Sequence, residues 1–254
     1  MNLSAAEIAV LEGVAARGWP AEREGRIGAW RLHASSGYSG RINACWPLGD
    51  PSRDLDAAID AVEAWYVEQG LPPLFKAIDT AASVNVLDAL AERLYRPRTT
   101  TLVMVAPAAA CEVTGIRLTS ELDDGFAAVF LSAGPAGSAD PGDARERLAT
   151  LARVPAPRAF ATGSPAGKPI AIGAAAVEGA WAGVFAMRTD PAHRRRGLAR
   201  RVLAALTSFA AEQRAKRVYL QVEAGNAPAI ALYQAAGFVE AYRYRYWEWS
   251  NGRG

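Results

Sequence analysis

Cysteine and histidine are scarce in this chain, and their scarcity removes whole classes of site. The 254 residues include two cysteines, Cys45 and Cys111, and two histidines, His33 and His193. These four residues match no zinc-ligand spacing, so we expect no metal site. The two distant cysteines favour free thiols over a disulfide framework, and free thiols are typical of a reducing cytoplasm. We therefore expect a cytoplasmic protein.

The sequence also lacks a large excess of charge of one sign. Its formal net charge is +2, with 21% charged and 51% hydrophobic residues. Binding of nucleic acid requires a broad basic face, which a near-neutral chain does not provide, so we expect no nucleic-acid partner. The apolar fraction predicts a packed globular core.

No apolar run is both long and uncharged enough to predict a membrane span. Residues 169–187 are the nearest candidate, but Glu178 interrupts the middle of the run, where a charge is costly. Two apolar segments around Glu178-Gly179 instead predict a β-hairpin. The first 18 residues contain Glu7 and Glu12 and no basic leader, which predicts a helix rather than a signal peptide. We expect a soluble protein with no membrane partner.

In the C-terminal half, the predicted order is one strand, two helices, three strands, then helix, strand, helix, strand. The expected strands are residues 112–118, 158–164, 168–177, 180–189, 217–225 and 238–249. The expected helices are residues 120–133, capped by Thr119 or Ser120, then 143–153, 197–214, and 227–237, capped by Asn226. Residues 134–142 are expected to form a loop. A mixed sheet with helices on its faces places the chain in the α/β (α+β) class.

The N-terminal half repeats the last part of that order. We expect strands at 27–34, 41–48, 72–78 and 99–106, with a helix carrying Leu55, Ile59, Val62 and Tyr66 on one face and another at 84–94. The order is then strand, strand, helix, strand, helix, strand, as in the last six elements of the chain. An internal duplication explains this repeat. We place the join between residues 106 and 110, which gives domains 1–108 and 109–254.

Arginines gather around Gly197 at a predicted helix start: Arg194, Arg195, Arg196, Arg200 and Arg201. A helix N-terminus has unpaired N–H groups and a partial positive charge, so each exposed arginine there is unfavourable by roughly 0.3–1 kcal/mol. An anion would reverse that cost, and a glycine lets a phosphate approach the backbone. The pattern therefore favours a phosphate site over a solvated helix start or a nucleic-acid patch.

Three features together resemble the GNAT acyltransferase superfamily. Arg194, Gly197 and Ala199 spell Arg-x-x-Gly-x-Ala, which is similar to that superfamily's Arg/Gln-x-x-Gly-x-Gly/Ala signature between a strand and a helix. Residues 226–238 spell Asn-x-x-Ala-x-x-x-Tyr-x-x-x-Gly-Phe, which is typical of its last helix. The order of elements is the third feature. The resemblance covers about residues 113–249 and implies a GNAT fold in the C-terminal half, with a partial GNAT-like repeat before it.

The resemblance implies an acetyl-CoA-dependent N-acetyltransferase, a transferase of the acyltransferase class. It would transfer acetyl directly to an amine of a small molecule or peptide. It implies that the ends of two elements hold the co-substrate. The strand end Met187, Arg188 and Thr189 would pair with the pantetheine arm, which resembles an added strand. Asn226 would contact the same arm, unless it only caps its helix. The pyrophosphate would lie against Arg194, Arg195, Arg196, Gly197, Leu198, Ala199 and Arg200.

The resemblance also implies catalytic residues. Tyr233 would protonate the leaving thiolate, the alternative being a tyrosine packed against the sheet. For the base we consider Glu223, acting through water, although the preferred reading of Glu223 is a plain exposed strand-end residue and a weakly basic acceptor would need no base. Glu178 lies in a predicted turn and is the weaker candidate, and solvent is another.

The N-terminal half has none of the co-substrate features. Residues 45–59 lack the signature and carry Asp50, Asp54 and Asp56, which would repel a pyrophosphate. Aligning Tyr95 with Phe238 places Leu90 at the position of Tyr233 and Ser83 at that of Asn226. We predict that this half binds no CoA and serves packing or acceptor selection. The alternative function for the chain is a non-catalytic CoA-binding module, and either a monomer or a homodimer is open.

Overall fold

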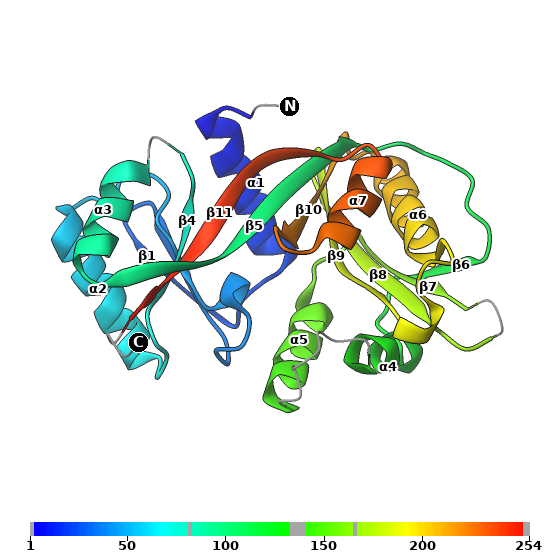
Figure 1. Ribbon diagram of the computed structural model, residues 1–254, viewed down its shortest axis with the longest axis horizontal. Helices are drawn as coiled ribbons and strands as arrows, with labels where there is room; N and C mark the ends of the chain where they lie inside the picture. Colours follow the sequence, from blue (N-terminus) through cyan, green and yellow to red (C-terminus); the bar gives the residue numbers. More distant parts are fainter. Residues whose placement is uncertain (1–2, 81–82, 133–140, 165–166, 251–254) are drawn as a thin grey trace.

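The computed structural model describes residues 3–80, 83–132, 141–164 and 167–250 (Figure 1). In the first half the elements are α1 (Ala5–Gly18), β1 (Arg23–Ile27), β2 (Trp30–Ala34), the 3-10 helix η1 (Gly40–Ile42), β3 (Cys45–Trp46), α2 (Leu55–Glu68), β4 (Leu74–Ile78), α3 (Val84–Glu92) and β5 (Tyr95–Pro107). In the second half they are β6 (Ile116–Thr119), α4 (Asp124–Ser132), α5 (Pro141–Arg153), β7 (Arg158–Gly163), β8 (Ala171–Glu178), β9 (Trp181–Thr189), the 3-10 helix η3 (Pro191–His193), α6 (Leu198–Glu212), β10 (Arg217–Glu223), α7 (Ala227–Ala235) and β11 (Val239–Trp249).

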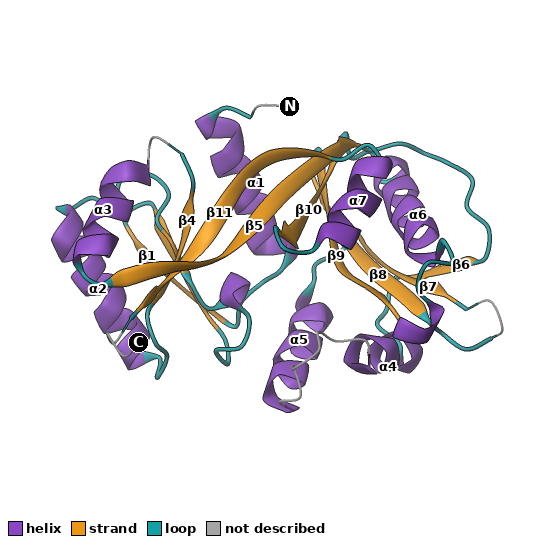
Figure 2. Ribbon diagram, viewed as in Figure 1, coloured by secondary structure: helices purple, strands orange, loops and turns teal. Residues whose placement is uncertain are grey.

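The strands of both halves form one continuous sheet, and the two halves exchange their last strands. Among the described residues the order is β1-β2-β3-β4-β11-β5-β10-β9-β8-β7-β6. Strand β11 pairs with β4, with Tyr246 opposite Lys76, and β5 pairs with β10, with Met104 opposite Leu220. The long β5 and β11 therefore cross the centre of the molecule side by side (Figure 2).

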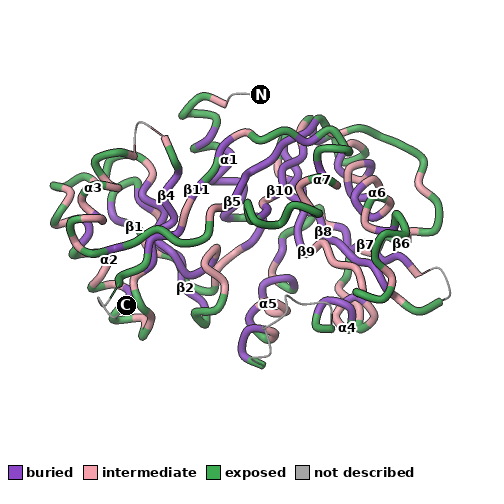
Figure 3. Tube along the Cα trace, in the orientation of Figure 1, coloured by how far each residue is buried: buried purple, intermediate pink, exposed green. Residues whose placement is uncertain are grey.

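Helices cover both faces of this sheet. On one face α2 and α3 pack over the strands of the first half, and α6 and α7 over those of the second. On the other face α1, α4 and α5 share a single core with side chains from both halves, including Tyr242, Tyr244 and Tyr246 of β11. The buried segments run through the central strands (Figure 3). We call the α1/α4/α5 side the shared face, because both halves contribute to it.

The predicted element order of the second half is confirmed, and most of its boundaries agree within a few residues. Residues 169–187 form the predicted hairpin of β8 and β9, with Gly179 in its turn. No helix in the described part of the chain has the length and apolar character needed to span a membrane. Most of the predicted loop 134–142 lies outside the described residues.

One cap and one strand of the second half were predicted wrongly. Helix α4 begins at Asp124, and its cap is Asp123, whose carboxylate accepts from the Phe126 N–H at 2.8 Å, rather than Thr119 or Ser120. The strand expected at 112–118 is confined to Ile116–Thr119. Thr119 is the last residue of β6 and its hydroxyl donates to the Glu121 carbonyl at 2.9 Å, so the helix starts later, where Asp123 supplies the cap.

In the first half two predicted strands were wrong. Residues 27–34 contain the end of β1, a tight turn and β2; Gly28 has φ +56°, and a Cβ there would lie 2.3 Å from the Pro51 carbonyl carbon. Residues 41–48 contain the end of η1 and the two-residue β3. The Asn43 side chain accepts from the Ser35 and Gly37 N–H groups, which holds this segment as a loop.

The predicted alignment of the two halves is confirmed at several positions. Helices α3 and α7 are both nine residues long, with Ser83 and Asn226 as N-caps, and each ends before a residue of positive φ, Leu94 or Gly237. The strands that precede them also correspond, because β1-β2-β3-β4 and β7-β8-β9-β10 have the same antiparallel, antiparallel and parallel pairings. The repeat therefore extends to β1, one strand further than predicted.

Candidate acetyl-CoA and acceptor site

Strands β9 and β10 separate partway along their length and leave a wedge in the sheet. They pair in parallel from Arg217 opposite Trp181 to Leu220 opposite Val184, and no pair follows within the described residues. Beyond that point β9 pairs only with β8, and β10 only with β5. The edges that face each other, residues 185–189 and 221–223, therefore have free backbone groups. An extended ligand could pair with these groups as an added strand does.

A local irregularity shapes the β9 side of the wedge. Ala186 has φ +54°, and the register with β8 shifts between Ile172 and Ala174. Such a bulge changes the direction in which the strand presents its side chains and bends it locally. No sequence pattern indicated this bulge, because alanine has no preference for positive φ.

The predicted strand-end residues lie along this wedge, with side chains on both faces. Met187 packs on the face that α6 covers. Its sulfur lies beside Gly173 of β8, where an added Cβ would be 2.5 Å away. Arg188 points to the shared face, where it donates to the Phe130 carbonyl at 2.5 Å and lies 4.0 Å from the Phe130 ring. The Thr189 hydroxyl is buried and has no hydrogen-bond partner among the described residues. An unpartnered buried hydroxyl at the wedge fits a site for a polar ligand.

The start of α6 offers a row of free backbone N–H groups. Gly197 is the N-cap, with φ +74° and no side-chain cap, and Arg195 also has positive φ, +60°. Within the described chain, the N–H groups of residues 195–200 make no hydrogen bond. Left-handed residues beside a helix start turn several N–H groups toward one point, which is the geometry of an anion site.

The arginines around this helix start divide into two kinds. Arg194, Arg195, Arg196 and Arg200 are exposed, and none forms an ion pair with a described residue. Arg194 Nε lies 3.4 Å from the Thr189 carbonyl oxygen, at the end of β9. Arg201 instead donates to the Thr114 carbonyl before β6. Four of the five clustered arginines are thus free to meet an anion, and Arg201 is a packing residue.

Tyr233 and Glu223 lie on opposite faces of the sheet. Tyr233, on α7, is 7% exposed and packs with Phe238, their ring centroids 6.1 Å apart, over Val218, Leu220 and Val222. Burial raises the pKa of Tyr233 to about 12, so its hydroxyl is protonated at neutral pH. Glu223 is exposed at the end of β10, and alternation along the strand directs it to the shared face, as it does Tyr219.

Two further predicted residues have defined partners. Asn226 accepts from the Ala229 N–H at 3.2 Å and so caps α7, and its own N–H donates to the Glu223 carbonyl at 2.9 Å. Glu178 pairs with Arg17 of α1, with its Oε1 2.8 Å from Nε. Because Glu178 lies at the closed end of the β8–β9 hairpin and already has a cationic partner, it is poorly placed to act as a base.

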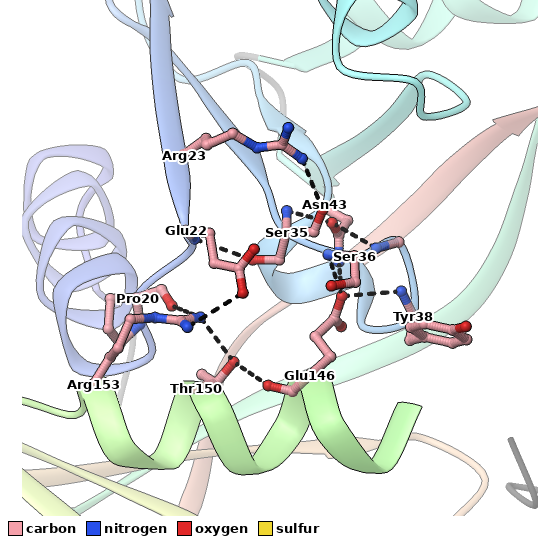
Figure 4. A network of polar contacts seen from close by, with 11 residues as sticks. Pro20, Glu22, Arg23, Ser35, Ser36, Tyr38, Asn43, Glu146, Thr150 and Arg153 are labelled. Atoms are coloured by element: carbon pink, nitrogen blue, oxygen red, sulfur yellow. Dashed lines mark hydrogen bonds and ion pairs between the residues drawn. The ribbon is translucent and has the colours of Figure 1, made fainter. Parts of the chain in front are cut away.

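The shared face includes a contact between the halves that the sequence did not reveal. Glu146 of α5 accepts from the N–H groups of Ser36, Tyr38 and Ser39, at 2.7, 3.2 and 2.7 Å, and from the Asn43 side chain at 3.2 Å (Figure 4). These partners lie more than 100 residues from Glu146 along the chain. The contact fixes the loop of residues 36–43, including η1, beside the second half.

The described residues contain no group of three or more histidine, cysteine or acidic side chains that could hold a metal ion. Both cysteines are free thiols, Cys45 buried and Cys111 exposed. The two described cavities, of about 560 and 360 Å³, lie elsewhere: one beside Tyr242 and Asp79, the other beside Arg17 and Glu178.

Comparisons with known proteins agree with this geometry. Residues 5–247 match the family model described as "Probable histone acetyltransferase Rv0428c C-terminal". The uncharacterized N-acetyltransferase YobR of Bacillus subtilis is 26% identical over 246 residues, which span 94% of this chain and 98% of that protein. A GCN5-related N-acetyltransferase from Kribbella flavida superposes with a TM-score of 0.71 at 17% identity, covering 99% of this chain and 97% of that one. A tandem GNAT protein from the clavulanic acid biosynthesis pathway gives a TM-score of 0.59 at 14% identity, covering 93% and 86%.

Proposed function

Because the chain belongs to the family described as "Probable histone acetyltransferase Rv0428c C-terminal", and through it to the GNAT acetyltransferases, we propose that it transfers an acetyl group from acetyl-CoA to an amine. One observation carries the proposal: the wedge between β9 and β10 ends at an uncapped helix start with four arginines that form no ion pair with any described residue. A molecule with a strand-like arm and a pyrophosphate has the chemistry that this combination would bind.

In this proposal the backbone of residues 195–200 and the arginines beside Gly197 bind the pyrophosphate. Charge-assisted hydrogen bonds from guanidinium groups are about twice as strong as neutral ones, so the unpaired arginines would contribute strongly. Residues 187–189 would align the pantetheine arm along the free edge of β9. The buried Thr189 hydroxyl, which lacks a partner among the described residues, would then gain one.

The chemistry would be a direct transfer between the two bound substrates. The amine nitrogen attacks the thioester carbonyl carbon, a C–N bond forms and the C–S bond breaks. Tyr233 gives its proton to the departing thiolate, which requires the protonated hydroxyl that its raised pKa ensures. The proton that the amine loses leaves on the opposite face, through water to Glu223 or to solvent.

The test is to follow CoA release with a panel of amines for the wild-type protein and Tyr233→Phe. We expect kcat to fall about 100-fold, because the general acid is lost, while the Kd for acetyl-CoA stays the same. Tyr66→Phe is the matched control: it removes the hydrogen bond from a buried tyrosine to the His33 carbonyl, so it should lower stability and leave kcat unchanged.

An unchanged kcat for Tyr233→Phe would overturn the assignment of the acid. Acetyl-CoA binding without release of CoA for any amine would favour a non-catalytic CoA-binding module. If acetyl-CoA neither binds nor raises the melting temperature, the proposed function itself is wrong.

A further inference from the structure

Three hydrogen-bond donors from both halves lie together on the shared face without partners. The indole N–H of Trp19 and the hydroxyl of Tyr219 are buried, and neither has a hydrogen-bond partner among the described residues. Arg41 of η1 is half-buried, and it forms no ion pair or hydrogen bond with the described part of the chain. Its guanidinium carbon lies 5.7 Å from the centroid of the Trp19 ring.

This cluster lies at the closed end of the wedge. Phe185 is the first residue of β9 after the last pair with β10, and its ring centroid lies 5.6 Å from that of Trp19 and 6.1 Å from that of Tyr219. Burial raises the pKa of Tyr219, and Arg41 opposes that rise, as a cation close to the hydroxyl does. Arg41 acts in the same way on Tyr246 of β11. The guanidinium therefore lies between α1, β10 and β11, over the shared face.

Two glycines, Gly183 and Gly18, lie directly against these groups. A Cβ on Gly183 would lie 2.5 Å from the Tyr219 hydroxyl and 2.3 Å from the end of the Phe185 ring. A Cβ on Gly18 would lie 3.1 Å from both atoms. Any side chain at Gly183 would displace the two aromatic rings. The positions next to the unpartnered hydroxyl thus carry no side chain that could compete with a ligand.

The acidic groups that face this region already have partners. Glu12 is held by Lys76 and by the Tyr242 hydroxyl, and Glu178 is held by Arg17. Asp143 pairs with Arg147 at 2.6 Å. A second cation, Arg188, faces the same side; burial, followed by the nearby Arg147, lowers its pKa to about 10, so it stays charged at neutral pH. The uncompensated charge around Arg41 is therefore positive, whereas Glu223 lies four residues beyond Tyr219, at the end of β10.

Chemical complementarity then selects the ligand. An indole N–H and a guanidinium can only donate, and a tyrosine hydroxyl can donate as well as accept. A carboxylate only accepts, and it matches the planar fork of a guanidinium. Leaving a partly buried cation unpaired is costly, and a bound carboxylate removes that cost.

We propose that Arg41, with Trp19 and Tyr219, forms a subsite that binds a carboxylate of the acceptor. The acceptor would then be an amino acid or a short peptide. Its free carboxylate would be separated from the reacting amine by no more than the length of one amino-acid side chain. This inference rests on the proposed function and adds its substrate class. It also gives the first half a role: through η1, that half supplies the residue that selects the acceptor.

The experiment compares amino acids with their carboxamides, which differ only in the charge of the group that Arg41 would bind. CoA release is measured for each pair with the wild-type protein, Arg41→Met and Arg41→Lys. The wild type should prefer the carboxylate by about 10-fold or more in kcat/KM, because a hydrogen-bonded charge is lost in the carboxamide. Arg41→Met should abolish the preference, mainly through KM for the acceptor, and Arg41→Lys should restore part of it.

Arg53→Met is the matched control, because Arg53 is an exposed arginine of the same half that lies before α2. It should keep the preference. The Kd for acetyl-CoA should be the same in all variants, since Arg41 lies away from α6. If carboxamides are equal or better substrates, or if Arg41→Met keeps the preference, the carboxylate subsite is wrong. CoA release with carboxamides or with amines lacking a carboxylate would then leave the proposed function standing.

Discussion

Helices α2 and α6 begin in the same way, and their N-termini end up with opposite chemistry. The residue two positions before each N-cap has positive φ, Ser52 with +59° and Arg195 with +60°. Yet α2 is capped by Asp54, whose carboxylate accepts from the Ala57 N–H at 3.0 Å, whereas α6 has no side-chain cap. The Asp54 carboxylate thus satisfies an N–H group of the first helix start, whereas the N–H groups of residues 195–200 make no hydrogen bond with the described residues.

The parallel strand pairs β3–β4 and β9–β10 differ in the same sense. In the first half, β3 and β4 pair at Cys45 and Phe75, and the residues that follow, Trp46 and Lys76, point to the shared face. Lys76 is fully buried there, with its ammonium 3.6 Å from the centroid of the Trp46 ring and paired with Glu12. In the second half the corresponding residues are Phe185 and Gln221, and Gln221 accepts from the Tyr244 hydroxyl at 2.9 Å. A buried ion pair thus occupies one position, and neutral side chains occupy the corresponding positions of the other.

The comparison shows that the two repeats share their backbone conformation and differ in the side chains that cap helices and carry charge. Positive φ recurs at Leu94 and Gly237, although only glycine adopts it without strain. Caps and charges differ instead, and in the proposed function they decide which half binds the anionic donor. Each prediction below exchanges or removes one of these differences.

The largest effect is expected at the buried ion pair of the first half. Lys76→Met leaves the Glu12 carboxylate buried without its cation, so the free energy of unfolding should fall by about 3–5 kcal/mol, measured by urea denaturation. Gln221→Met, its counterpart, removes only the partner of the Tyr244 hydroxyl and should cost about 1 kcal/mol. Adding Glu12→Gln to Lys76→Met should recover part of the loss. If both substitutions lower the free energy of unfolding equally, the comparison of the two strand pairs is wrong.

The next prediction places at the N-cap of α6 the carboxylate that caps α2. Gly197→Asp places a carboxylate at the N-cap of α6, as in α2, and should weaken acetyl-CoA binding about 100-fold by calorimetry, through repulsion of the pyrophosphate. Gly197→Ala is the control: a Cβ there has no neighbour within 4 Å, so only the strain of φ +74° remains, about 1 kcal/mol of stability. If alanine weakens binding as much as aspartate does, charge is not what distinguishes the two helix starts.

The smallest effect tests whether the first half takes part in binding the donor. Asp54→Ala removes the cap of α2 and should cost about 1 kcal/mol of stability, while Asp54→Asn should keep most of it. Neither change should alter the Kd for acetyl-CoA. A tighter or weaker Kd in Asp54→Ala would show that the two helix starts are coupled.

Much of the site could be predicted from local patterns. The signature at Arg194, Gly197 and Ala199 lies at a helix start, as expected, and Asn226 caps α7. Periodicity found both hairpin strands in residues 169–187. The hairpin turn at Gly28 was missed because its flanking residues lack clear alternation. Arg201 belongs to the arginine cluster in the sequence but not to the predicted pyrophosphate residues, and its contact with Thr114 shows that it turns away.

The sequence by itself determined the order of elements in the second half, the internal repeat and the position of the uncapped helix start, because these depend on spacing and on neighbouring residues. The tertiary structure decided the exchange of β5 and β11, the burial of Lys76 with Glu12, and the place of Arg41 over the shared face. A strand's alternation is the same whichever neighbour it pairs with, so the pattern cannot name its partner. A buried charge likewise gains its partner only when distant segments meet, here residues separated by 64 positions.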